Sequence, residues 1–451
     1  MAEEKGQAQD QPRLISYIIS PQVQKAIEEN PAEPQDVIIS LIEDPHLGVK
    51  PAQTALQEWI VSQLDVVVRP SEFYLFARLT PDQIRAVAMR GEVYQIWLDS
   101  DCQVHLLSSA DTIKAPASWR TFEARGKGIT WAVMDTGIRY DHPHLANNIN
   151  KTLSKNFSNS PDEEDVNGHG THVAGIIAGQ APAGSQPSAA TLLGDDTNVK
   201  ITPLDALPSG VAPLATLVNV KVLDDNGSGK ASRAILGLEY LRQLNQATSG
   251  ITIDGVNMSL GYPFDPKYYG CGYSPLCEEV RRAVNSGLVV VISCGNEGYG
   301  MVRLKTGQEV PLYLQLSIAD PANTEEAIAV GSTHKTKPHN YGISFFSSKG
   351  PTGDGRIKPD LVAPGEKILS CSLHFNSPNG QQYDYEERSG TSMAAPHVSG
   401  AIAAFLSVNK EFRADPRRVK EIFKKTATDL GRERSFQGAG LVDTLRALMS
   451  V

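Results

Sequence analysis

The stretch ITWAVMDTG, residues 129–137, runs from a strand-like series of apolar residues directly into an aspartate, a threonine and a glycine. Further along the chain, similar apolar runs alternate with helical stretches. They are THVAGIIAG (171–179), TLVNVKVL (216–223), SRAILGLEYLRQLN (232–245), LVVVISC (288–294) and AIAVGST (327–333). This alternation is typical of a parallel sheet with helices on both faces. The sequence therefore predicts an α/β fold with a doubly wound, mostly parallel sheet.

Three short segments place an aspartate, a histidine and a serine among small residues. They are AVMDTG around Asp135, NGHGTHVAG around His169 and SGTSMAAP around Ser392. A serine becomes a nucleophile near neutral pH when an imidazole takes its proton and a buried carboxylate holds that imidazole. Taken alone, these residues would more often be a turn aspartate, a core histidine and a helix cap. Together, among glycines that let backbone and substrate approach closely, they predict acyl transfer at a serine.

From about Ile113 to its end, the chain resembles the subtilases, the subtilisin-like serine proteases, in these motifs and in their order. The resemblance implies that Ser392 is the nucleophile, His169 the general base and Asp135 the residue that orients the histidine. It also implies a subtilisin-like fold and a serine endopeptidase that works through an acyl-enzyme. His172 follows His169 by three residues, but we expect no metal site there, because no third ligand lies nearby in the sequence.

A fourth candidate site residue is Asn296 in SCGNEG, which follows a strand-like apolar run at residues 288–292. It is expected at the carboxyl end of a strand, where open parallel sheets build their sites. On the residues alone, an ordinary turn asparagine is also a fair interpretation. The subtilase resemblance implies that its amide acts with the N–H of Ser392 on the oxyanion. A helix that begins at Ser392 would add the partial positive charge of its N-terminus.

Two further segments, LDDNGSG (223–229) and NMSLG (257–261), match the parts of subtilases that form the edges of the substrate cleft. The resemblance implies that the substrate lies extended between them as an added strand and is held through its main chain. The substrate-binding residues carried over in this way are Ser228, Gly229, Ser259, Leu260 and Gly261. Because such recognition depends little on side chains, we expect broad specificity. Without the triad, DDNGSG would read as a plain turn.

The N-terminal hundred residues predict a separate module. Its apolar patterns predict strand, helix, strands, helix and strand, which is the order of a small α+β ferredoxin-like unit. The segments, in the same order, are DVIISLI, QTALQEWIVSQL, VVVRPSEFYLFARLT, PDQIRAVAMRG and VYQIWLD. It resembles the subtilase inhibitor propeptide, which implies an intramolecular inhibitor and a zymogen that cleaves itself, here between Asp101 and Asp111. We divide the chain into a polar extension (1–34), a propeptide module (35–106) and a catalytic domain (107–451). A docking domain retained in the mature protein is the alternative.

The chain has 451 residues and a formal net charge of −9. With no evident cluster of lysine and arginine, this charge argues against nucleic acid or an anionic membrane as partners and leaves protein and peptide substrates. The start, MAEEKGQAQDQPR, lacks the apolar run of a signal peptide, so we expect a cytoplasmic protein and leave non-classical export open. The five cysteines are too few for a disulfide scaffold, and only Cys271 and Cys277 suggest a local bridge.

No cofactor is expected for the chemistry. Subtilases often hold a structural calcium through an aspartate in a His-Pro-Asp-Leu segment, which here reads His142, Pro143, His144, Leu145. A Gly/Pro/Ala/Ser-rich insertion at about 179–210 replaces the loop of that site, so we do not expect this calcium. Asp195, Asp196 and Asp205 in the insertion are candidates for a hard cation but read better as solvated charges. Two other functions stay open: a processing protease or macrocyclase that transfers the acyl group to a peptide amine, and a non-enzymatic module that keeps the fold.

Overall fold

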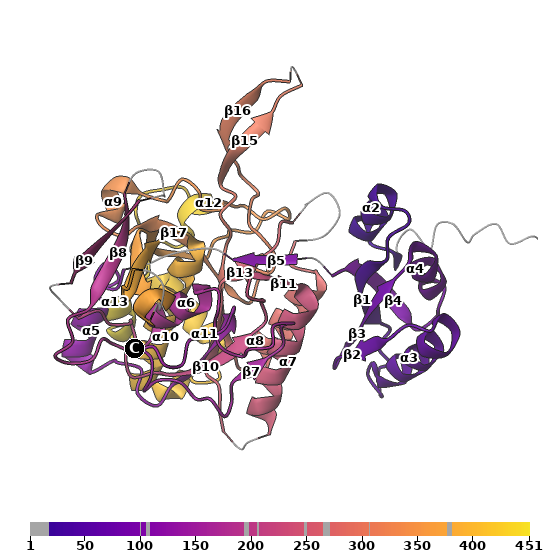
Figure 1. The fold of residues 1–451 in the computed structure, drawn as a ribbon, viewed down its shortest axis with the longest axis horizontal. Coiled ribbons are helices and arrows are strands. Elements are labelled where there is room, and N and C mark those ends of the chain that lie inside the picture. The colour runs from indigo at the N-terminus through magenta and orange to yellow at the C-terminus, as the bar shows by residue number, and fades with distance from the viewer. Residues whose placement is uncertain are drawn as a thin grey trace, which may run out of the picture. The chain divides into compact units, whose positions relative to one another are not determined.

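A computed structural model describes residues 18–99, 101–104, 109–193, 198–204, 207–247, 250–264, 271–305, 307–376 and 381–451. These residues fall into two compact units, which divide between Ser100 and Asp101 (Figure 1). Strand β5 (Asp101–Val104) belongs to the larger unit, so the division lies a few residues before the predicted boundary at 106.

The small unit is a four-stranded antiparallel sheet with helices packed on one face. Its elements are β1 (Gln35–Leu41), α3 (Lys50–Leu64), β2 (Val68–Pro70), β3 (Tyr74–Leu79), α4 (Pro81–Ala88) and β4 (Val93–Leu98). The strand order β2-β3-β1-β4 is the expected ferredoxin-like arrangement. An additional helix, α2 (Pro21–Glu29), lies within the stretch predicted to be a polar extension. Its Val23 and Ile27 are buried in the core of this unit, because this nine-residue helix packs its single apolar face there despite its polar composition.

The large unit is built on a seven-stranded sheet in the order β18-β17-β14-β12-β6-β10-β7. The strands are β6 (Thr130–Asp135), β7 (Lys155–Asn156), β10 (Thr216–Lys221), β12 (Gly255–Met258), β14 (Val289–Ser293), β17 (Ile328–His334) and β18 (Leu361–Glu366). Every pairing between them is parallel. After β6, the chain adds β7 and β10 on one side of β6 and then β12, β14, β17 and β18 on the other side. The sheet is therefore doubly wound as predicted, and the strand order reverses beside β6.

Helices cover both faces of this sheet. Helix α10 (Thr391–Val408) crosses β12, β14, β17 and β18 and packs beside α6 (His169–Ile177) on one face. On the other face lie α7 (Ala231–Gln246) and, packed beside it, α8 (Pro275–Asn285). Helix α7 is so close to β6 and β10 that a methyl group at Gly237 would clash with the side chains of Met134 and Val220. The shorter helices are α5 (Ala115–Phe122), α9 (Pro338–Tyr341), α11 (Pro416–Thr426), α12 (Arg434–Gln437) and α13 (Thr444–Leu448), with 3-10 turns at Leu373–Asn376 and Lys410–Phe412.

Three smaller sheets surround the main one. A three-stranded sheet joins β11 (Ser228–Lys230), β5 and β13 (Leu260–Gly261), and the hairpin β15 (Tyr299–Arg303) and β16 (Glu309–Tyr313) stands out from the unit (Figure 1). The third contains β19 (Ile368–Cys371), β20 (Tyr385–Arg388), β8 (Ser188–Leu193) and β9 (Asn198–Pro203). The predicted insertion at 179–210 therefore includes a hairpin that adds to β20, while Asp195, Asp196 and Asp205 lie outside the described residues.

The structure also tests the suggested local bridge between two cysteines. Cys271 and Cys277 are both buried free thiols and form no bridge with each other. Among the described residues, only α10 is long and apolar enough to cross a membrane, and 89% of it is buried inside the protein, as in the core helix of a globular domain.

His144 stands where the subtilase calcium motif has an aspartate, and its ring is part of an internal hydrogen-bond network. Its Nδ1 lies 3.0 Å from the Tyr385 hydroxyl and its Nε2 3.1 Å from the carbonyl of Ala178. Burial lowers the pKa of His144 to about 3 and also lowers that of His142. A neutral imidazole already bonded through both nitrogens does not fit a hard cation, which prefers oxygen ligands. No group of three or more metal-ligating side chains lies among the described residues.

We expect the free energy of unfolding to fall as the pH drops below about 6.5, the ordinary histidine pKa. His142 and His144 stay neutral in the folded chain, whereas in the unfolded chain both take up a proton. The unfolded state then binds more protons than the folded state, so stability rises with pH from the lowered pKa values up to about 6.5, by at most about 1.4 kcal/mol per pH unit for each histidine.

Urea unfolding of a Ser392→Ala variant between about pH 4.5 and 7.5 measures this slope without self-digestion. A His144→Phe variant in the same background should give a shallower slope, whatever its absolute stability. An equal slope in both proteins would contradict the assignment.

Candidate active site

The candidate residues gather where three strands of the main sheet end. Asp135 is the last residue of β6, Ser259 directly follows β12, and Asn296 lies three residues after β14. The N-termini of α6 and α10, which carry His169 and Ser392, meet the same edge of the sheet. Open α/β sheets place their sites at this carboxyl edge, beside the point where the strand order reverses. The structure therefore brings the four predicted catalytic residues to one place.

Asp135 and His169 form a fully buried pair. The Nδ1 of His169 lies 2.7 Å from Oδ1 of Asp135, which also accepts the N–H of Thr136 at 2.7 Å. Because a carboxylate only accepts, Nδ1 carries a proton, and in the neutral tautomer that this contact selects Nε2 is the nitrogen with the lone pair. Gly170 makes this closeness possible, since a methyl group there would lie 2.1 Å from the carbonyl of Gly137 and 3.1 Å from Cβ of Asp135.

His172 lies on the same helix but belongs to a different environment. Its Nε2 lies 3.1 Å from the carbonyl of Glu386 on β20, and burial lowers its pKa well below the ordinary value. No hydrogen bond joins it to Asp135 among the described residues. The Asp135 carboxylate therefore selects His169 of the two histidines.

Ser392 and Ser259 are held by reciprocal hydrogen bonds. Oγ of Ser392 donates to the carbonyl of Ser259 at 3.3 Å, and Oγ of Ser259 donates to the carbonyl of Ser392 at 2.5 Å. In a regular helix that carbonyl would accept the N–H of residue 396, but Pro396 has none. Pro396 is the sixth helical residue, because α10 begins at Thr391. Pro396 therefore lies beyond the free N–H groups of the first turn. Because it donates no hydrogen bond, the carbonyl of Ser392 is free to accept the hydroxyl of Ser259.

Asn296 is oriented by the start of α10. Its Oδ1 accepts hydrogen bonds from both the N–H and the Oγ1 of Thr391, each at 3.0 Å. Because the oxygen end of the amide is fixed there, the Nδ2 end points away from Thr391. Ser392 is the second residue of the helix, so its N–H has no intrahelical partner. Two donors of the kind that stabilise an oxyanion thus flank the same helix terminus.

The two predicted substrate edges are bridged by a strand of the chain itself. In the antiparallel sheet β11-β5-β13, Ser228 pairs with Gln103 and Gly229 with Cys102, while Leu260 pairs with Val104 and Gly261 with Gln103. Four of the five carried-over residues are therefore main-chain partners of an extended segment (Figure 1), while the fifth, Ser259, is bonded to Ser392 instead. Close packing requires glycine at 261, because a methyl group there would lie 2.9 Å from the carbonyl of Asp320.

The arrangement of triad, helix terminus and cleft edges agrees with the comparison with known proteins. A sequence profile described as "Subtilase family" matches residues 126–441, well over half of the chain. The chain belongs to the subtilase family. It is therefore a serine-type endopeptidase.

Three relatives of this subtilase come from Bacillus subtilis (strain 168). "Serine protease AprX" is 30% identical over 382 residues, which cover 81% of this chain and 77% of the relative. "Major intracellular serine protease" is 36% identical over 333 residues, with 72% and 83% covered. "Subtilisin E" is 33% identical over 335 residues, with 74% and 69% covered.

Asp165 is a buried carboxylate of this subtilase that the sequence analysis missed. Its Oδ1 accepts the Thr136 hydroxyl and the N–H of Gly168, each at 2.9 Å, and the N–H of Asn167 at 3.0 Å. Its Oδ2 accepts both the N–H, at 2.9 Å, and the hydroxyl, at 2.6 Å, of Thr171. It thereby ties the loop after Asp135 to the first turn of the helix that carries His169. The signal in the sequence was an acidic residue four positions before that histidine, at a helix start.

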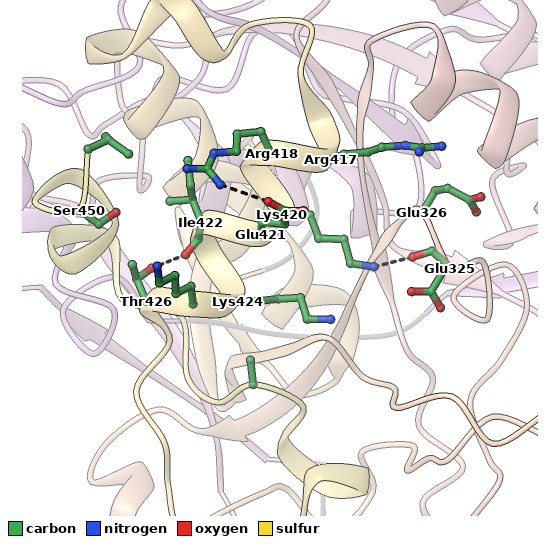
Figure 2. A pocket seen from close by; sticks show the side chains of 13 residues that line it. Glu325, Glu326, Arg417, Arg418, Lys420, Glu421, Ile422, Lys424, Thr426 and Ser450 are labelled. Carbon is green, nitrogen blue, oxygen red and sulfur yellow. Dashed lines mark hydrogen bonds and ion pairs between the residues drawn. The ribbon is translucent and has the colours of Figure 1, made fainter.

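A pocket of about 950 Å³ lies away from these residues, along α11 (Figure 2). Five basic side chains of this helix line it: Arg417, Arg418, Lys420, Lys424 and Lys425. This corrects the expectation that the chain has no basic cluster, which overlooked five cations within nine residues. Acidic groups largely offset them, since Arg418 pairs with Glu421 at 3.2 Å and both Lys420 and Lys424 pair with the buried Asp360. None of the lining residues belongs to the triad or to the cleft edges.

Asp165→Asn should lower the turnover of this subtilase by about tenfold or more, with little change in KM. Asparagine keeps one acceptor, but its NH2 group would face main-chain N–H groups, so the loop and the helix lose their common anchor. The measurement is kcat and KM on a peptide substrate, with the rate at which a fluorophosphonate labels Ser392.

Asp141→Asn is the matched control, because that carboxylate is largely exposed and pairs with the guanidinium of Arg139 at 2.6 Å, while only the main-chain N–H of Arg139 contacts Thr171. A lowered melting temperature with unchanged kcat in Asp165→Asn would show that Asp165 only stabilises the fold.

Proposed function

We propose that this subtilase is made as a precursor that its own N-terminal module inhibits, and that it becomes active after cleaving itself once between Asp101 and Asp111. The observation that carries the proposal is the position of β5. It runs antiparallel between β11 and β13, with main-chain pairing to both edges of the cleft. It also follows β4, the last strand of the small module, after only two residues. The chain that leaves the module thus lies where a substrate is expected to bind.

In this proposal Ser392 attacks the carbonyl carbon of the bond to be cut, and Nε2 of His169 takes the hydroxyl proton. Asp135, at 2.7 Å from Nδ1, keeps the imidazole in the correct tautomer and stabilises the imidazolium that forms. The negative oxygen of the tetrahedral intermediate is stabilised by Nδ2 of Asn296 and the N–H of Ser392. His169 then gives its proton to the leaving amine, and water hydrolyses the acyl-enzyme by the same proton path in reverse.

The same geometry supports broad specificity. The bonds that hold β5 connect main chains, so they are available to any extended segment without proline at the bonded positions. Protein and peptide substrates are therefore the proposed partners, with the chain's own module as intramolecular inhibitor. We also propose a location inside the cell, which is supported by likeness to the relative named "Major intracellular serine protease". All four residues of the catalytic set are present, which does not favour a binding module without activity.

Asn296→Ala should lower kcat by roughly 100- to 1000-fold, the loss known for an oxyanion-hole amide in subtilisin, and change KM little. The reason is that the amide stabilises charge that appears only in the transition state. Steady-state kinetics on a peptide substrate provide the test, with the exposed Asn147→Ala as control. A change confined to KM would instead assign Asn296 to substrate binding.

The intact mass of the full-length protein, measured beside its Ser392→Ala variant after incubation with an unfolded protein substrate, tests the precursor proposal. The wild type should lose roughly a hundred N-terminal residues and degrade the substrate, while the variant should do neither. A wild type that degrades substrate with its N-terminal module still attached would support the retained docking domain. Self-cleavage by the Ser392→Ala protein would rule out Ser392 as the nucleophile.

A further inference from the structure

The hairpin of β15 and β16 carries apolar side chains on both of its faces, although it stands out from the large unit (Figure 1). The cross-strand register places Tyr299, Met301 and Tyr313 on one face and Val302 and Leu312 on the other. Met301 and Tyr313 are each 62% exposed. Apolar side chains that gather on an exposed surface mark an interaction site, since a sheet face in water is ordinarily polar. The hairpin is therefore expected to bind a partner.

The base of the hairpin is held in place by its own unit. The ring of Tyr299 lies 5.4 Å from that of Tyr313 and 5.7 Å from that of Phe345, measured between centroids. Nζ of Lys349 donates to the carbonyl of Gly298 at 3.1 Å and lies 5.2 Å from the centre of the Tyr313 ring. Because these contacts already order the hairpin, binding a partner does not require its ordering.

The hydrogen bonds within the hairpin show which main-chain groups are left for a partner. The N–H of Leu304 donates to the carbonyl of Gln308 at 2.8 Å, and the N–H of Leu314 donates to the carbonyl of Gly298 at 3.0 Å. Bonded and non-bonded pairs alternate along an antiparallel ladder, so the pairs between these two ends follow from the register. The odd-numbered residues of β15 and β16 therefore direct their N–H and C=O groups away from each other's strand.

The two outer edges differ in their capacity to add a strand. On β16 the middle outward position is Pro311, which has no N–H, so this edge cannot continue a regular ladder. On β15 the outward residues are Tyr299, Met301 and Arg303, and each has an N–H group. Within the described part of the chain, no hydrogen bond joins these main-chain groups to another segment. The hairpin thus has one open edge, and that edge is β15.

We propose that the open edge of β15 pairs with the same edge of a second copy of this chain, antiparallel about a two-fold axis at Met301. In this register Met301 faces the second copy's Met301, and Arg303 faces the second copy's Tyr299. The guanidinium then packs on an aromatic ring and keeps its own cross-strand neighbour, Glu309, at its side, so no like charges face each other. The two hairpins become one four-stranded sheet in which each facing pair exchanges two main-chain hydrogen bonds.

The sequence of β15 favours a second copy over an unrelated extended segment. Two-fold symmetry repeats every contact, so one strand with an aromatic residue at its first position and an arginine at its last is complementary to itself. A shift of four residues toward the tip would instead place Arg303 opposite the second copy's Arg303, which like-charge repulsion disfavours. Because the strand has only five residues, the interface is small, and we expect a dissociation constant in the micromolar range.

Sedimentation velocity of the full-length Ser392→Ala protein, from about 1 to 200 µM, measures this association without self-digestion. Met301→Pro removes the central outward N–H and leaves the bonds within the hairpin, as Pro311 does at the cross-strand position. Met301→Ala is the matched control, because it also removes the long side chain but keeps the N–H. The dissociation constant of Met301→Pro should exceed that of Met301→Ala by at least about tenfold, since the dimer loses both central hydrogen bonds.

Cysteine substitutions in the same Ser392→Ala protein test the register. Bonded antiparallel pairs have Cα atoms about 5.5 Å apart, which lies within the disulfide range of about 4.4–6.8 Å. Met301→Cys should therefore form a disulfide between two copies under a mild oxidant. Arg303→Cys is the matched control, because the two copies of this residue would lie four residue steps, or about 14 Å, apart. The parent protein gives the background, since its described free cysteines are buried.

Melting temperatures show whether each variant folds, and either comparison stands if a variant of the other does not. A protein that stays monomeric over the whole range, or a dimer equally tight in Met301→Pro and Met301→Ala, would overturn the proposal. No disulfide in Met301→Cys, or as much in Arg303→Cys, would overturn the register. A monomeric enzyme whose Met301→Pro variant loses kcat/KM on an unfolded protein but not on a short peptide would assign the edge to substrate instead.

Discussion

The structure depends on one constraint, which is that the N-terminus of a buried helix must meet the carboxyl edge of a parallel sheet without unpaired polar groups. Helix α10 is buried along nearly its whole length and packs across β12, β14, β17 and β18. Its first N–H groups have no partner within the helix. Asn296, three residues after β14, accepts one of them from Thr391 at 3.0 Å. The N–H of Ser392 has no partner within the helix, and in the proposed mechanism it stabilises the oxyanion, so one constraint serves both the fold and the site.

Pro396 shows how a missing hydrogen bond becomes part of this arrangement. A proline inside a helix leaves the carbonyl four residues earlier without its donor, and a buried carbonyl without a donor costs about 1–3 kcal/mol. Here that carbonyl belongs to Ser392, and the Ser259 hydroxyl donates to it at 2.5 Å. Ser259 immediately precedes β13, one edge of the cleft. A hydrogen bond thus joins the backbone of Ser392 to Ser259 beside the cleft edge. In a regular helix this bond would not form, because the Ser392 carbonyl would already accept an N–H from the helix itself.

The residues that the sequence predicted well are those whose chemistry is local. A strand that ends in Asp135, and glycines that permit close approach, can be read from one short segment, and the doubly wound sheet follows from alternating apolar runs. The roles of residues whose hydrogen-bond partners lie far away in the sequence could not be predicted from short segments in this way. Asp165 matters because Thr136 and Thr171 both donate to it, and His144 because Tyr385 and Ala178 lie beside it. Helix α2 was missed because its polar composition hides the single face that carries Val23 and Ile27.

Main-chain recognition creates a difficulty for a protease, since any extended segment fits the cleft, including the protease's own chain. The pairing of β5 with β11 and β13 makes that difficulty useful, because a covalently attached strand reaches the cleft at a far higher effective concentration than a free substrate. In the proposed precursor, cutting the chain removes this advantage, and the few main-chain bonds that remain must then compete with substrate. The proposed broad specificity is consistent with this, because control through chain connectivity does not require selective side chains around Ser392. On this proposal one cleft serves first for the chain itself and later for other proteins.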